Sequence, residues 1–153
     1  MTLIDSNLMD ICNEYQAFDA EKRAYLAENA FADIELAYTE MNGGDPEEGH
    51  RRAAMLVMHA AMADGRLAKD EYNLLAPMLE RMNGAPVPYD KAVSLIDVTT
   101  SGEEAVRQVL YARKELMDYK PILLGSFRML LMSVCAIDGR IDLIERHWLS
   151  KVI

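Results

Sequence analysis

Residues 55–79 read MLVMHAAMADGRLAKDEYNLLAPML, and residues 129–153 read MLLMSVCAIDGRIDLIERHWLSKVI. The two segments align without a gap at a separation of 74 residues, and eight of the 25 aligned positions are identical. The shared pattern is an apolar helix, then Asp-Gly-Arg followed by Leu or Ile, then a Glu six residues after the Gly, within a second helix. A duplicated unit of this kind predicts that two related hairpins form most of the domain.

Helix signals also dominate the rest of the chain. Asp19 can cap a helix that runs toward Met41, and Asp45-Pro46 starts a second helix that ends at Asp64-Gly65. Ser101-Gly-Glu-Glu104 has the form of a capping box, and Pro121 opens the apolar helix of the second copy. We therefore predict an all-α fold, a helical bundle built from two pseudo-repeated helix–Asp-Gly–helix hairpins plus an N-terminal helical extension.

The remaining helix boundaries follow from glycines and local capping signals. We expect a third helix from about Lys69 to Met82 that stops at Asn83-Gly84, and a short one from Lys91 to Ile96. The last helix starts at Asp142.

The negative charge is concentrated in the N-terminal third of the chain. The formal net charge is −9, but residues 1–48 contain 12 Asp or Glu against Lys22 and Arg23, which makes −10, and the remainder carries +1. We divide the chain into an acidic N-terminal helical extension, residues 1–44, packed on a helical domain, residues 45–153. Because no basic stripe is available to displace counterions from phosphate, we expect no nucleic-acid binding. A basic protein partner, or self-association into a homo-oligomer, fits the acidic helices better.

Cysteine usage and hydropathy indicate the cytoplasm. Cys12 and Cys135 lack the close spacing of a zinc site or redox pair, so we interpret them as buried, reduced thiols. The first ten residues have neither the basic nor the apolar region of a signal peptide. Pro121 to Ile137 is apolar but contains Arg128 and is short for a bilayer, so we expect a core helix and no transmembrane segment.

The repeated acids invite comparison with a calcium-binding EF-hand loop. Aligning Gly65 and Glu71 with that loop puts Ala60 and Met62 at the first two ligand positions, where oxygen ligands are required. The second copy likewise places apolar residues there. The EF-hand interpretation therefore fails.

The paired motifs resemble the tellurite-resistance TerB-like family, which also forms the N-terminal part of DjlA-type co-chaperones. The resemblance covers roughly Ala53 to Ile153 and rests on Ala61–Leu67 with Glu71 and on Cys135–Ile141 with Glu145. It implies a bundle of two pseudo-equivalent halves in which the motif acids hold a divalent cation. Because these ligands are carboxylates, we expect magnesium or calcium rather than zinc. The corresponding metal candidates here are Asp64, Glu71, Asp138 and Glu145.

A purely structural interpretation of the motif stays open. Asp142 and Glu145 form a capping box, Gly65 and Gly139 can end helices, and Asp residues before such glycines bond loop N–H groups. Ala68 departs from the family's usual cap, and Arg66 and Arg140 lie among the acids and weaken cation binding.

The sequence shows no recognisable set of catalytic residues. No nucleophile stands beside a base, His59 is interpreted as a core or boundary residue, and Glu14, Glu21, Glu28 and Glu35 recur every seven residues as a solvated helix face. We therefore expect a noncatalytic TerB-like binding module in tellurite or chemical stress response. The alternatives are a metal-free interaction domain that uses its acidic N-terminal helices and a hydrolase that works through a metal held by the motif acids.

Overall fold

The chain folds as an all-α protein. The structure is a computed structural model of the 153-residue chain and describes residues 10, 12–63, 76–77, 79–81, 83–94, 101–135, 149–150 and 152. Its helices are α2 (Ala20–Met41), α3 (Pro46–Met62), α5 (Tyr89–Val93), α6 (Gly102–Tyr119), the short 3₁₀ helix η1 (Pro121–Leu123) and α7 (Leu124–Cys135). Residues 12–17 are also helical, and no strand occurs in the described ranges. The predicted all-α bundle is confirmed at this level.

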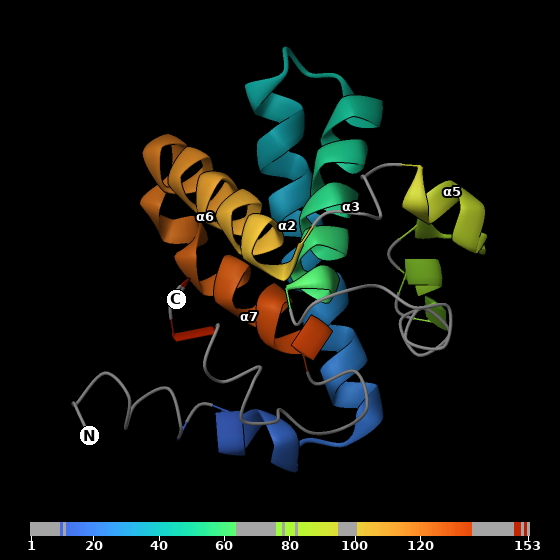
Figure 1. Cartoon of the computed structure of the whole chain (residues 1–153), viewed down its shortest axis with the longest axis vertical. Helices are drawn as coiled ribbons and strands as arrows, with labels where there is room; N and C mark the ends of the chain where they lie inside the picture. The colour runs from blue at the N-terminus through green and yellow to red at the C-terminus, as the bar shows by residue number, and fades with distance from the viewer. Residues whose placement is uncertain are drawn as a thin grey trace.

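Helix α3 occupies the middle of the bundle. It forms an antiparallel hairpin with α2, and α7 packs against both of these helices (Figure 1). Figure 1 places α6 and α5 on opposite sides of α3. Two hollows flank α3 as a result, one toward α5 and one toward α6.

Local capping explains the boundaries of the α2–α3 hairpin. The Asp19 carboxylate accepts a hydrogen bond from Lys22 N at 2.7 Å and starts α2, as predicted. Gly43 has φ of 71°, a left-handed value that suits glycine and turns the chain back after Met41. Asp45 then caps α3 by accepting from Glu47 N at 3.0 Å, with Pro46 in the first turn.

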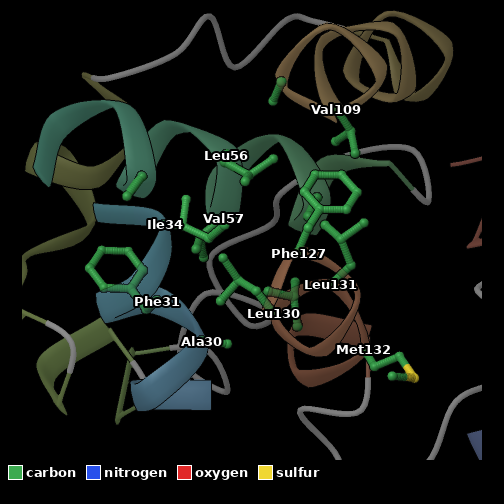
Figure 2. Packing of buried hydrophobic residues seen from close by; sticks show 14 of the residues in the cluster. Ala30, Phe31, Ile34, Leu56, Val57, Val109, Phe127, Leu130, Leu131 and Met132 are labelled. Carbon is green, nitrogen blue, oxygen red and sulfur yellow. The ribbon is translucent and has the colours of Figure 1, made fainter. Parts of the chain in front are cut away.

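The core is shared by all four long helices. Figure 2 shows Ile34 of α2, Val57 of α3, Val109 of α6 and Leu131 of α7 converging in one cluster, and each is completely buried. Tyr15 belongs to the same cluster. Its hydroxyl lies 2.6 Å from Ser133 Oγ, so the segment before α2 is tied directly to α7.

Several predicted boundaries differ from the structure. Pro121 opens a 3₁₀ turn rather than an α-helix, because α7 begins only at Leu124. Ser101 caps α6 as expected, but the Glu104 carboxylate bonds Arg107 and Gln108 instead of completing a reciprocal capping box. The first copy's helix ends at Met62, before Asp64-Gly65, and the short helix starts at Tyr89 rather than Lys91.

Other predictions on the chain are partly tested. Cys12 and Cys135 are both buried thiols, as expected. No helix within the described residues is long and apolar enough to span a bilayer. The predicted helices from Lys69 and from Asp142 fall mostly outside the described residues, although Gly84, with φ of 78°, follows the first of them as predicted.

Candidate functional site

The predicted metal ligands lie outside the part of the chain that the structure describes. Asp64, Glu71, Asp138 and Glu145 all fall within residues 64–75 or 136–148. Among the described residues, no group of three or more His, Cys, Asp or Glu side chains is arranged to hold a metal ion. The cation site therefore stays a prediction from the sequence.

The structure instead presents an apolar pocket on the α5 side of α3. Its volume is about 330 Å³, which is at the lower end of the range for small-molecule sites. Its floor is formed by Phe31 of α2, Met58 of α3, Ala92 of α5 and, from the chain before α5, Leu79. All four are buried. Pro86 and Val87 add a wall from the segment that precedes α5.

An ion pair connects the chain between Leu79 and this wall to α2. Arg81 Nη2 lies 3.0 Å from Glu28 Oε2, and Arg81 Nε also donates to that oxygen at 3.2 Å. Both side chains are about half exposed, so the pair contributes little to stability.

A histidine and a glutamate pair beside the pocket. His50 of α3 lines the pocket, and its Nδ1 lies 2.5 Å from Glu35 Oε2 of α2. The imidazole also meets Phe31 edge-on, with ring centroids 5.6 Å apart at 76°. These two contacts hold the ring in one orientation. Glu35, predicted to lie on a solvated helix face, is partly exposed, at 34% of its side chain, and its carboxylate is engaged by His50.

Most polar groups at the pocket rim are already engaged. Arg51 donates to both carboxylate oxygens of Glu48, and hydrogen bonds from Arg51 and Arg52 lower the pKa of Glu48 to about 2. Ser94 Oγ donates to Lys91 O at 2.6 Å. Asn83 Nδ2 donates to a backbone carbonyl within its own turn at 3.1 Å.

Two rim charges remain without an ionic partner. Neither the Glu47 carboxylate nor the Lys91 ammonium lies within 4.0 Å of an opposite charge on any residue that the structure describes. Both line the same pocket and both are exposed. Among the lining residues that the structure describes, the pocket therefore combines an apolar floor with one negative and one positive group that lack an ionic partner.

A second, more polar hollow of about 270 Å³ lies between α3 and α6. Arg52 crosses it, because its Nε lies 3.0 Å from Glu48 Oε1 and its Nη1 lies 3.9 Å from Glu115 Oε2. Burial, reinforced by the Glu115 charge, raises the pKa of Tyr38 well above its ordinary value. His59 also lines this hollow, and burial lowers its pKa although the Glu104 charge opposes the shift.

The lowered pKa of His59 predicts a loss of stability on mild acidification. Below pH 6.5 the unfolded chain protonates this histidine before the folded chain does. Acidification therefore favours unfolding until the pH falls below the pKa of the folded state. Urea unfolding at pH 7.5 and pH 5.5 should show a smaller loss of stability in His59→Gln than in the wild type. Equal losses in the two proteins would contradict this assignment.

Sequence reasoning missed the Glu35–His50 pair because its members come from two different helices. The one available clue in the sequence was that α2 carries Glu35 and that the first turns of the next helix, α3, carry a histidine. The chemistry of the pocket has to be inferred from its own geometry, since comparisons with protein-family models, curated proteins and solved structures found no match to this chain.

Proposed function

We propose that this chain is a noncatalytic helical binding module of the TerB-like type, acting in chemical stress response, and that it takes a small ligand in the α2–α3–α5 pocket. The observation that carries the binding site is the apolar floor of Phe31, Met58, Leu79 and Ala92 beneath a polar rim. Small-molecule sites typically combine such a lining with a few polar groups that orient the ligand. The link to stress response rests on the sequence resemblance.

The two-hairpin architecture belongs to the same proposal. The first helix of each copy is contained in α3 and α7, and these two helices pack against each other. Related units that bury their apolar helices against one another are what a duplication produces. The turns with Asp64-Gly65 and Asp138-Gly139 complete the two hairpins in this proposal.

Binding in the pocket should be visible at Met58, whose side chain is buried in its floor. In methionine-methyl NMR spectra, a pocket ligand should shift the Met58 signal and leave Met132 of α7, which does not line the pocket, unchanged. Ala54→Trp should abolish the shift by filling the pocket, whereas Ala32→Trp on the exposed face of α2 should not. A panel of small apolar and amphipathic compounds that leaves Met58 unmoved would remove the pocket from the proposal.

Divalent-cation binding by the motif acids is a separate part of the proposal. A hard cation needs several oxygen ligands, so Asp64, Glu71, Asp138 and Glu145 would have to act together, with water completing the coordination. Positive helix ends and the two motif arginines oppose a cation, which predicts weak magnesium- or calcium-like affinity.

Calorimetry with magnesium and calcium tests the cation site. Asp64→Asn combined with Asp138→Asn should abolish binding by removing two ligands. Arg66→Gln combined with Arg140→Gln should strengthen it by removing two competing positive charges. If no variant and no wild-type sample gives measurable heat while circular dichroism shows intact folds, the motif is structural capping only.

A second candidate function is protein interaction through the acidic N-terminal helices without a metal. Tyr25 and Leu36 of α2 favour it, because they are 60% and 59% exposed among acidic neighbours. At 100° per residue, both lie on a face of α2 that is well separated from Phe31 in the pocket. A basic partner held on this face would therefore stay bound to the pocket-filled Ala54→Trp variant.

A further inference from the structure

The charges at the mouth of the α2–α3–α5 pocket indicate the class of its ligand. Arg51 is engaged by Glu48, and His50 is engaged by Glu35, so neither offers a full free charge to a ligand. Glu47 and Lys91 are the two described rim residues whose charges are uncompensated. An anionic ligand alone would meet the repulsion of Glu47, and a cationic ligand alone would meet that of Lys91. A ligand with both charges complements both groups.

The pocket's size and floor restrict the ligand further. A volume of about 330 Å³ suits a molecule of amino-acid size better than a nucleotide or a lipid. Among the described lining residues, the buried ones, including Phe31, Met58 and Leu79, carry no charge, so we expect the part of the ligand that enters to be apolar.

We infer that the pocket binds a free α-amino acid with an apolar side chain, such as leucine, methionine or phenylalanine; this inference rests on the proposed function of the pocket. The ammonium group pairs with Glu47, the carboxylate pairs with Lys91, and the side chain enters between Phe31 and Met58. In an α-amino acid the ammonium group, the carboxylate and the apolar side chain are all attached to one carbon atom. Glu47 and Lys91 supply the two opposite charges that such a molecule needs, and both line the same apolar pocket.

The inference predicts which analogues bind. The Met58 methyl signal should shift saturably with leucine, methionine or phenylalanine. Isocaproate and isoamylamine each keep the apolar branch of leucine but only one of its charges, so each should bind about tenfold more weakly, a difference of about 1.4 kcal/mol. Glutamate and lysine should bind no better than these analogues, because their side chains would carry a charge into the apolar floor.

Two charge substitutions test which rim residue binds which charged group of the ligand. In Glu47→Gln the wild-type preference for leucine over isocaproate should disappear, and in Lys91→Met the preference for leucine over isoamylamine should disappear. Both residues are exposed, so the variants should keep the fold. The matched controls are Glu103→Gln, another acid in the first turn of a helix, and Lys114→Met on exposed α6. Both controls should retain the two preferences.

The outcomes separate this inference from the proposed function. If an analogue with one charge, or an uncharged compound, shifts Met58 as tightly as leucine does, the amino-acid assignment is overturned and the pocket function stands. Retention of the wild-type preferences in both charge variants overturns the assignment as well. If no probe of any class shifts Met58, both the assignment and the pocket function are overturned.

Discussion

Gly49→Ala is expected to lower the free energy of unfolding by about 3 kcal/mol, the upper end of the usual cost of overpacking. Gly49 is buried inside α3, where alanine is intrinsically the better helix former by about 1 kcal/mol. A Cβ atom at this position would lie 2.0 Å from Thr39 Oγ1, 2.7 Å from Thr39 N and 2.8 Å from Glu35 O. Two of these are backbone atoms of α2 that cannot rotate away. The two helices would have to separate.

The same substitution at Gly125 is the matched control. A Cβ atom there meets nothing within 4 Å, and the residue is exposed in the first turn of α7. Gly125→Ala should therefore leave stability unchanged or raise it by up to about 1 kcal/mol. Urea unfolding followed by circular dichroism measures both variants. If the two give the same small effect, α2 and α3 do not cross as closely as the structure has them.

The crossing at Gly49 also positions the pocket. His50 follows Gly49 directly in α3, and Glu35, whose carbonyl the new Cβ would meet, carries the carboxylate that holds His50. Separation of the two helices would lengthen the 2.5 Å contact between His50 Nδ1 and Glu35 Oε2. We therefore expect the Met58 methyl signal to report weaker ligand binding in Gly49→Ala and unchanged binding in Gly125→Ala.

Features with a local cause were predictable from the sequence. The starts of α2, α3 and α6 follow from the carboxylate or hydroxyl of Asp19, Asp45 and Ser101, each of which accepts a backbone hydrogen bond within its own turn. The turn between α2 and α3 follows from glycines with positive φ. Such interactions span three or four residues, so the order of residues alone specifies them.

Features that depend on how helices cross were not predictable in the same way. Glu35 has the spacing of a solvated stripe, yet the close approach of α3 at Gly49 brings His50 onto its carboxylate. The α2–α3–α5 pocket requires Met58, Leu79 and Ala92 to meet from separate segments. Helical periodicity identifies each of them as apolar and facing inward, but it does not say where packing leaves a hollow.

The start of the apolar helix at Pro121 shows a smaller limit on what the sequence predicts. Proline is well suited to a first helical turn because it lacks an N–H group to satisfy, and that rule alone does not separate an α-helical turn from a 3₁₀ turn. Here Leu123 N bonds Lys120 O at 3.0 Å, which is 3₁₀ geometry. Ile122 in this turn is 87% exposed, although the next residue, Leu123, is buried.

Phe127→Ala is expected to cost about 4 kcal/mol of unfolding free energy, in the range found when a buried aromatic ring is removed. Phe127 of α7 is completely buried, and in Figure 2 its ring points from α7 toward Val109 of α6. Leu131, one turn later on α7, lies in the same cluster. Neighbours from two helices cannot collapse fully into the space that the ring leaves. A cavity therefore adds to the lost burial.

Ile122→Ala provides the control, because it also truncates a large apolar side chain, in η1 just before α7. Its 87% exposure means that little is lost on truncation, so the change should stay within about 0.5 kcal/mol. In thermal unfolding, Phe127→Ala should lower the midpoint by roughly 10 °C, while Ile122→Ala should barely move it. Should Phe127→Ala fail to fold, Phe127→Leu, at about 1.5 kcal/mol, still ranks the two positions. A cost below 1 kcal/mol for Phe127→Ala would mean that α6 and α7 do not share one core at this residue.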